Sequence, residues 1–226
     1  MQVNTSAIVL SAIKYKDSSL IVSCYTKKIG VQSYILYHIF KARKAKINPA
    51  YFQLLTQLEI QTNYKHNQSL HKITEVKLLH SYNSIHSNIY KSTVSMFIAE
   101  VLQNILKEEE KNEELYDFLE ASLLWYDLNN FNANFHLIFL LKISQYLGIY
   151  PDKETLNMNF FKHEKTNFKI NILNELLGIN FDNLYSIKIN AQMRQNILNE
   201  ILDYFSNHLG YFKKPKSLKV LHDIFN

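Results

Sequence analysis

The residues with the clearest chemical potential lie in one short basic segment, residues 41–46. This segment carries four positive charges in six positions: Lys41, Arg43, Lys44 and Lys46. Cationic side chains neutralise phosphates and release counterions, while exposed aromatic rings stack on bases. The segment also follows an aromatic-rich stretch, residues 31–40. This combination predicts a nucleic-acid contact, and the alternative is a solvated loop whose charge only aids solubility.

The basic segment is part of a wider basic region at the start of the chain. Residues 1–80 hold 11 Lys and Arg residues against three Asp and Glu residues, a net charge of +8, whereas the whole chain carries +5. This excess favours nucleic acid as the ligand. We predict a binding surface formed by Lys14, Lys16, Tyr34, Lys41, Arg43, Lys44, Lys46 and Lys65. For the tyrosines of this region, packing in the core is the alternative to stacking on bases.

The sequence offers little material for a catalytic or metal centre. It contains only four glycines and lacks the glycine-rich patterns that cradle phosphates. Its nine histidines are scattered, and the carboxylates of residues 108–110 would face different directions on a helix, so they would not converge on one ion. The single Cys24 can form neither an intrachain disulfide nor a cysteine-rich zinc site. We therefore expect no enzyme activity, no metal and no cofactor.

Composition indicates a globular, cytoplasmic protein. Hydrophobic residues make up 47% of the chain, which is enough to bury a core, and no apolar run approaches the 18 or so residues of a membrane span. The first residues lack the basic-then-apolar layout of a signal peptide. The single thiol fits a reducing compartment. We therefore expect a cytoplasmic location and no membrane contact.

Five short apolar runs fill the basic region and predict strands. Apolar and polar residues alternate along residues 58–61, as they do in a strand with one solvated face. Gly30 offers the positive φ that a hairpin turn needs. Five strands with this spacing predict a small barrel of the OB type. The runs are residues 7–15, 20–26, 31–40, 52–64 and 70–79.

The pattern changes to a helical period at about residue 84. Val94, Ile98 and Val101 belong to one apolar stripe, and Gly148 is expected to cap a later helix. We therefore predict an α+β fold, with an OB-fold barrel in residues 1–80 and an all-α helical domain in residues 81–226. Beyond the first helix, the expected helices are residues 113–128, 131–147, 171–177, 180–187 and 193–209, with a short one that ends at residue 225.

A basic turn after the last long helix is a candidate partner site. It mixes cations with apolar anchors, which suit an acidic peptide that ends in an aromatic residue. The alternative is that this tail packs on the helices and closes the fold. The candidate residues are Lys213, Lys214, Lys216, Leu218 and Leu221.

Several segments of the chain resemble the bacterial RecO family of recombination mediators. They occur in the family's order and with its spacing, they span nearly the whole chain, and they are most similar to Bacteroidetes-like forms. The segments are residues 5–10, 17–22, 25–30, 52–60, 112–115, 134–137, 146–151 and 215–218.

This resemblance implies an OB-fold joined to a helical domain, binding of single- and double-stranded DNA, and annealing of complementary strands. It also implies partners: RecR, sometimes RecF, and the acidic C-terminal tail of single-strand-binding protein (SSB), so that RecA can replace SSB on gapped DNA. Two departures matter. Many relatives carry a four-cysteine zinc motif where residues 152–170 hold no cysteine, and the glycine common before the basic loop is missing near Ile39 and Phe40.

Two other function classes stay open at this point. An adaptor, whose barrel binds an acidic protein, would bind oligonucleotides weakly and without preference for single strands. A nuclease or other phosphotransfer enzyme would turn over a labelled DNA strand in magnesium or manganese. A mediator instead binds DNA with an affinity that falls as salt rises.

Overall fold

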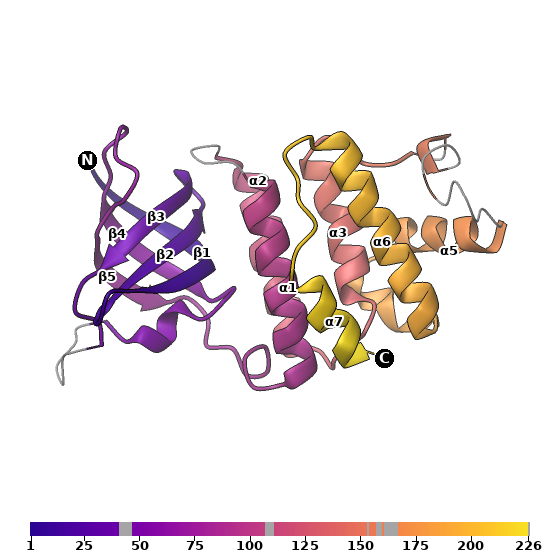
Figure 1. The fold of residues 1–226 in the computed structure, drawn as a ribbon, viewed down its shortest axis with the longest axis horizontal. Helices are drawn as coiled ribbons and strands as arrows, with labels where there is room; N and C mark the ends of the chain where they lie inside the picture. Colours follow the sequence, from indigo (N-terminus) through magenta and orange to yellow (C-terminus); the bar gives the residue numbers. More distant parts are fainter. Residues whose placement is uncertain (41–46, 107–110, 153, 157–159, 161–166, 226) are drawn as a thin grey trace. The chain divides into compact units, whose positions relative to one another are not determined.

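A computed structural model gives the fold of the chain (Figure 1). It describes residues 1–226 except 41–46, 107–110, 153, 157–159, 161–166 and 226. Contacts within the chain divide it into two compact units, Met1–Leu128 and Asn129–Asn226. Each unit is described by itself below.

The first unit begins with a five-stranded antiparallel sheet that curls into a barrel. The strands are β1 (Gln2–Tyr15), β2 (Ser19–Thr26), β3 (Gly30–Leu36), β4 (Gln57–Asn63) and β5 (Ile73–Leu78), in the order β3-β2-β1-β4-β5. A parallel bridge between Tyr34 and His71 joins β3 to the residues just before β5. Two backbone bonds hold this seam: His71 N–H donates to Ser33 O at 2.8 Å, and Ile35 N–H donates to His71 O at 2.9 Å. The seam closes the barrel, so the two outer strands do not present long free edges there.

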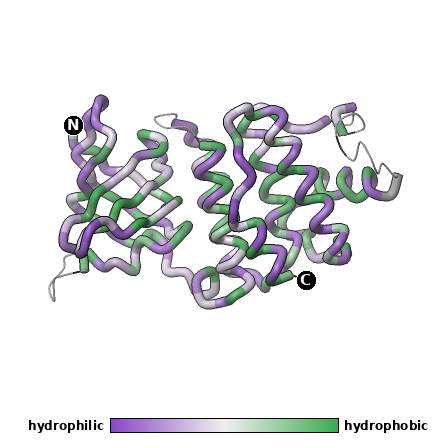
Figure 2. Tube along the Cα trace, in the orientation of Figure 1, coloured by the Kyte–Doolittle hydropathy of each residue, from purple (hydrophilic) through white to green (hydrophobic). Residues whose placement is uncertain are grey.

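Hydrophobic and hydrophilic residues intermix along the barrel strands (Figure 2). The alternating burial in β2 and β4 places one set of side chains inside the barrel. Val22 and Cys24 of β2 face Leu58 and Ile60 of β4 within one buried cluster, which also contains Tyr34. The intervening residues point outward. The predicted OB-fold barrel is therefore confirmed, and a helical region follows it.

Two helices of the same unit, α1 (Ile89–Ile105) and α2 (Glu113–Leu128), pack on the outside of the barrel. The amide of Gln57 in β4 donates to the carbonyl oxygen of Glu120 at 2.8 Å. The amide of Gln103 donates to the carbonyl oxygen of Leu10 at 2.7 Å. These helices therefore cover part of the outer surface of the barrel.

A buried polar cluster holds the segment between β5 and α1. The Asp127 carboxylate accepts backbone N–H groups from Asn83, Ser84 and Ile85 at 2.8 to 3.0 Å. The Lys91 ammonium donates to the carbonyl oxygen of Asp127 at 3.0 Å and to the Ser84 hydroxyl at 2.6 Å. Because buried charges are costly without partners, this network fixes the start of α1 against the end of α2.

The second unit is helical. Its elements are α3 (Phe135–Tyr146), α5 (Asn167–Gly178), the 3-10 helix η2 (Phe181–Ser186), α6 (Ala191–His208) and α7 (Leu218–Phe225). Helix α3 is nearly all apolar and is buried among α5, η2 and α6. Gly148 follows it with a φ of +70°, which confirms the predicted glycine cap. None of the described helices combines the length and the apolar character needed to cross a membrane.

Several predicted boundaries were wrong, and one helix is of a different type. Strand β1 begins at Gln2 rather than at residue 7, and α5 begins at Asn167 rather than at residue 171. Strand β3 ends at Leu36 rather than at residue 40, because His38 adopts a φ of +57° and residues 37–40 form a turn. Residues 49–52 form a 3-10 helix with Pro49 at its start, so β4 begins at Gln57 and not at residue 52. The helix expected over residues 180–187 is a 3-10 helix.

Candidate nucleic-acid interface

Two turns of the barrel meet at one end. The β1–β2 turn contains Lys16 and Ser18, and the turn after β3 contains His38 and Phe40. The Ser18 hydroxyl and the His38 ring nitrogen Nδ1 lie 3.3 Å apart, and Phe40 N–H donates to Ser18 O at 3.3 Å. Lys16 and His38 both have positive φ values, which bend each turn sharply. These contacts hold the two turns side by side.

Exposed aromatic rings and cations are interleaved across these turns. The Lys16 ammonium lies 5.3 Å from the centre of the Tyr15 ring, and the Lys72 ammonium lies 5.5 Å from the centre of the Tyr37 ring. Tyr37 is 54% exposed and Phe40 is 48% exposed, so both rings are accessible to a ligand. We call this set of six residues the loop surface: Tyr15, Lys16, Tyr37, His38, Phe40 and Lys72.

This composition suits single-stranded nucleic acid. Cations beside rings can contact phosphates while the rings stack on unpaired bases, and stacking needs no particular base. The β1–β2 and β4–β5 loops are those that flank the binding face of OB-folds. Lys72 comes from the β4–β5 connection, so both loop regions contribute to the loop surface.

The predicted contact residues fall into three groups. Lys14, Lys16 and Lys65 are exposed, and Lys16 belongs to the loop surface. Tyr34 is fully buried in the barrel core. The basic segment that contains Lys41, Arg43, Lys44 and Lys46 lies outside the described residues and begins directly after Phe40.

Tyr34 cannot stack on a base from its position in this fold. Its ring lies among core side chains, 6.2 Å from the His71 ring, and burial raises the pKa of its hydroxyl. An aromatic side chain that points inward from a strand packs in the barrel core and does not contact a ligand. We therefore leave Tyr34 out of the proposed interface.

Of the loop surface, only Lys16 is among the predicted contact residues. The other five members are Tyr15, Tyr37, His38, Phe40 and Lys72. Lys72 is 35 positions from Tyr37 in the sequence, and only the β3–β5 seam brings the two together. No sequence pattern marks His38 as a contact residue. It lies in a turn only because β3 ends at Leu36, whereas the sequence predicts a strand up to residue 40.

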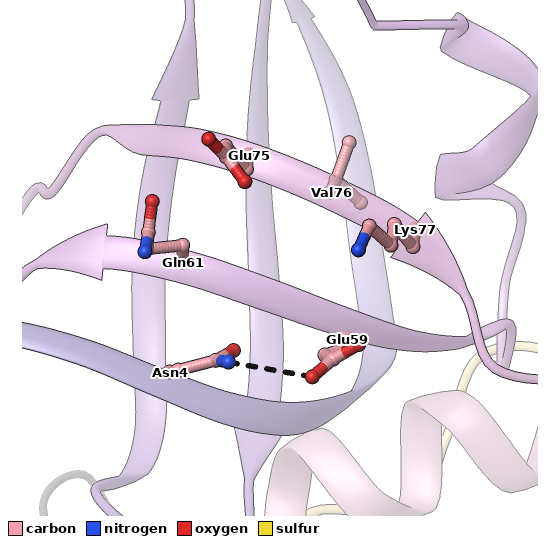
Figure 3. Close-up of a pocket in the computed structure, with 6 residues that line it drawn as sticks. All are labelled: Asn4, Glu59, Gln61, Glu75, Val76 and Lys77. Carbon is pink, nitrogen blue, oxygen red and sulfur yellow. Dashed lines mark hydrogen bonds between the residues drawn. The ribbon is translucent and has the colours of Figure 1, made fainter.

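A second face of the barrel has a different character. Asn4, Glu59, Gln61, Glu75 and Lys77 project from β1, β4 and β5 around a shallow pocket (Figure 3). We call these five residues the sheet face. The strand register places Glu59 opposite Lys77 and Gln61 opposite Glu75, and Asn4 donates to Glu59 at 3.3 Å. Two of the three acidic residues of residues 1–80 therefore lie here, with one compensating lysine.

The candidate partner residues of the tail lie before and within α7. Lys213 and Lys216 are exposed, and the Lys214 ammonium pairs with the Asp203 carboxylate at 2.7 Å. Leu218 is half-buried, while Leu221 is 1% exposed and packs inside the helical unit. The cations are therefore accessible, but Leu221 is a packing residue in this arrangement.

Comparisons with known proteins give the same family for both parts of the chain. A family model described as "Recombination protein O N terminal" matches residues 1–82, and one described as "Recombination protein O C terminal" matches residues 86–155. Proteins named "DNA repair protein RecO" from Flavobacterium psychrophilum and Flavobacterium johnsoniae are 41% and 40% identical, with 100% of each chain covered. The protein of the same name from Bacteroides fragilis is 31% identical, with 98% of each chain covered.

Proposed function

The chain belongs to the recombination protein O family, and we propose that it acts as a non-enzymatic mediator of DNA repair and homologous recombination. In this role it binds single- and double-stranded DNA and anneals complementary strands in the cytoplasm. The single observation that carries the proposal is the loop surface, where exposed rings and cations alternate at the end of an OB-fold barrel.

The loop surface supports annealing through electrostatics. Two complementary strands repel each other through their phosphates, and a cationic surface that binds both lowers this repulsion. The basic segment of residues 41–46 would add four charges next to Phe40. Lys14 and Lys65 are also exposed, and in this proposal they extend the cationic surface of the barrel.

The partners follow from family membership. We propose that the protein works with RecR and with the acidic C-terminal tail of SSB, and that it helps RecA to replace SSB on single-stranded DNA. The helical unit is the proposed docking region for the SSB tail. The exposed cations Lys213 and Lys216 favour an acidic peptide there.

A strand-annealing assay on SSB-coated complementary oligonucleotides tests the proposal. The wild-type protein should accelerate annealing, and the double variant Lys16→Ala, Lys72→Ala should be severalfold slower because it removes the two cations that lie beside exposed rings. Lys77→Ala on the sheet face is the matched control and should anneal at the wild-type rate. A wild-type protein that does not anneal with either intact SSB or SSB lacking its tail contradicts the mediator role. Weak, salt-insensitive DNA binding would favour the adaptor.

A further inference from the structure

Strand β5 is an outer strand of the sheet, and beyond the seam it has a free backbone edge. It pairs with β4 on one side, and the bridge to β3 is made by His71, which precedes the strand. Leu79 N–H donates to Gln57 O at 3.0 Å, and backbone bonds to β4 recur at every second position from there. Val76 and Leu78 therefore point their backbone groups away from β4. Among the described residues, none bonds to these groups.

The free edge is open to solvent. Thr74, Glu75, Lys77 and Leu78 are exposed, and Val76 is half-buried. An exposed strand edge is a template on which another chain can add a strand. Proteins often protect such an edge with a lysine, which is the alternative role of Lys77. Whether Lys77 prevents pairing depends on the side chain that a second strand places opposite it.

The sequence of β5 is self-complementary in one antiparallel register. When Val76 lies opposite Val76 of a second copy, Glu75 of each chain lies opposite Lys77 of the other. A two-fold axis forms this pair twice. The two Val76 residues can then exchange backbone hydrogen bonds, because both direct their N–H and C=O groups to the free edge. The exposed Leu78 lies opposite Thr74 of the second copy.

Glu75 gains a cross-strand partner from this pairing. Within one chain the strand register places Glu75 opposite the neutral Gln61, whereas Lys77 lies opposite Glu59. Figure 3 shows Glu75 and Lys77 together on β5, with β4 on one side of the strand. A second copy on the other side adds a lysine beside each Glu75, and charges alternate across the joined sheets.

The same two charges disfavour the neighbouring registers. A shift by two residues in one direction brings Lys77 opposite Lys77, and a shift in the other direction brings Glu75 opposite Glu75. A shift by one residue points the free backbone groups of one strand at groups that already bond to β4 in the other. The edge therefore accepts one register and opposes the alternatives.

We propose that β5 is the contact between two copies of this chain, which form a weak two-fold dimer with one sheet running through both barrels. The occupant of the edge is a second copy, because the charge pairs form only with a strand that carries glutamate and lysine at the same spacing. A single pair of short strands buries less than the roughly 1,200 Å² of stable complexes, so the dimer is reversible. The six residues of the loop surface lie outside the paired segment, so the proposal goes beyond the DNA contact.

Sedimentation velocity with the full chain, from about 5 to 200 μM, tests the proposal. The wild type should shift from monomer to dimer as its concentration rises. Glu75→Lys and Lys77→Glu should each weaken the dimer severalfold, because both cross-strand pairs then oppose like charges. Glu114→Lys, at an exposed position of α2, changes the net charge by the same amount as Glu75→Lys and is the matched control. It should dimerise as the wild type does.

Mixing the two charge variants separates pairing from folding. Equal amounts of the Glu75→Lys chain and the Lys77→Glu chain should associate with each other as well as the wild type does. Both cross-strand pairs are then again of opposite charge, and a folding defect in either chain does not produce this rescue. Leu78→Pro should also weaken the wild-type dimer, because it removes an N–H from the free edge without removing a bond to β4. Its thermal midpoint shows whether the barrel stays folded.

Three results overturn the proposal. The first is a wild type that stays monomeric up to about 200 μM, a range in which weak contacts of this size associate. The second is a wild type that dimerises while the mixed charge variants do not associate, since the contact then lies on another surface. The third is a folded Leu78→Pro chain that binds DNA more weakly as a monomer, which would assign the edge to DNA. Annealing at the wild-type rate by Leu78→Pro leaves the mediator role in place whichever way the dimer test falls.

Discussion

The loop surface and the sheet face belong to the same small barrel but differ in what they present to solvent. At the loop surface, Tyr37 and Phe40 are about half exposed and cations lie over two of the rings. On the sheet face, Glu59 lies opposite Lys77 in the strand register and accepts a hydrogen bond from the Asn4 amide (Figure 3). One surface presents cations and exposed rings to solvent, whereas the other presents two glutamates, one lysine and two amides.

Because the two surfaces differ, the net charge of residues 1–80 does not by itself locate the interface. The +8 of residues 1–80 is an average over the whole barrel. Two of the three acids project from β4 and β5, and the third, Asp17, lies beside Lys16 in the β1–β2 turn. The field that a phosphate chain meets therefore depends on the face it approaches and not on the average over the barrel.

The largest expected effect concerns the basic segment after Phe40. Changing Lys41, Arg43, Lys44 and Lys46 to Ala should weaken binding to any DNA sequence, because the lost contacts are to phosphates. The slope of log K against log salt should fall in magnitude by up to about 3 for a single strand. Anisotropy with a labelled oligonucleotide at two salt concentrations measures both quantities. An unchanged affinity and slope would remove this segment from the interface.

A smaller effect is expected from the exposed rings. Tyr37→Ala and Phe40→Ala should each cost about 1–3 kcal/mol of single-strand binding, because a base loses its stacking partner. The salt slope should stay the same, since no charge is removed. Tyr90→Ala, an exposed tyrosine on α1 of the same unit, is the matched control and should bind normally. Equal losses for Tyr37 and Tyr90 variants would mean that the rings act through folding rather than through contact.

The smallest effect is expected on the sheet face. Glu59→Gln with Glu75→Gln should raise DNA affinity by less than about threefold, because charges farther from the ligand than the Debye length of about 10 Å are largely screened at 0.1 M salt. The gain should shrink further at high salt in the same anisotropy titration. A clear loss of affinity would instead show that DNA contacts the sheet face. The distinction between a DNA-binding loop surface and a non-binding sheet face would then be wrong.

The sequence by itself determined the fold class and the excess of positive charge in residues 1–80. Short alternating runs predicted five strands, the helical stripe through Val94 and Ile98 predicted the following helices, and the excess of lysine in residues 1–80 predicted an anionic ligand. These are local or summed properties, so they can be read without knowing which residues are neighbours.

Only the tertiary structure decided which side chains share a surface. Tyr34 and Tyr37 are three positions apart, yet one is in the core and the other is exposed, because β3 ends between them at Leu36. Lys72 reaches the Tyr37 ring only through the seam that His71 makes with β3. Helix packing brings His136, Arg194 and His222 to one small pocket, although 86 positions separate the two histidines in the sequence. Strand ends, barrel closure and helix packing depend on long-range contacts, and alternation along a chain does not encode them.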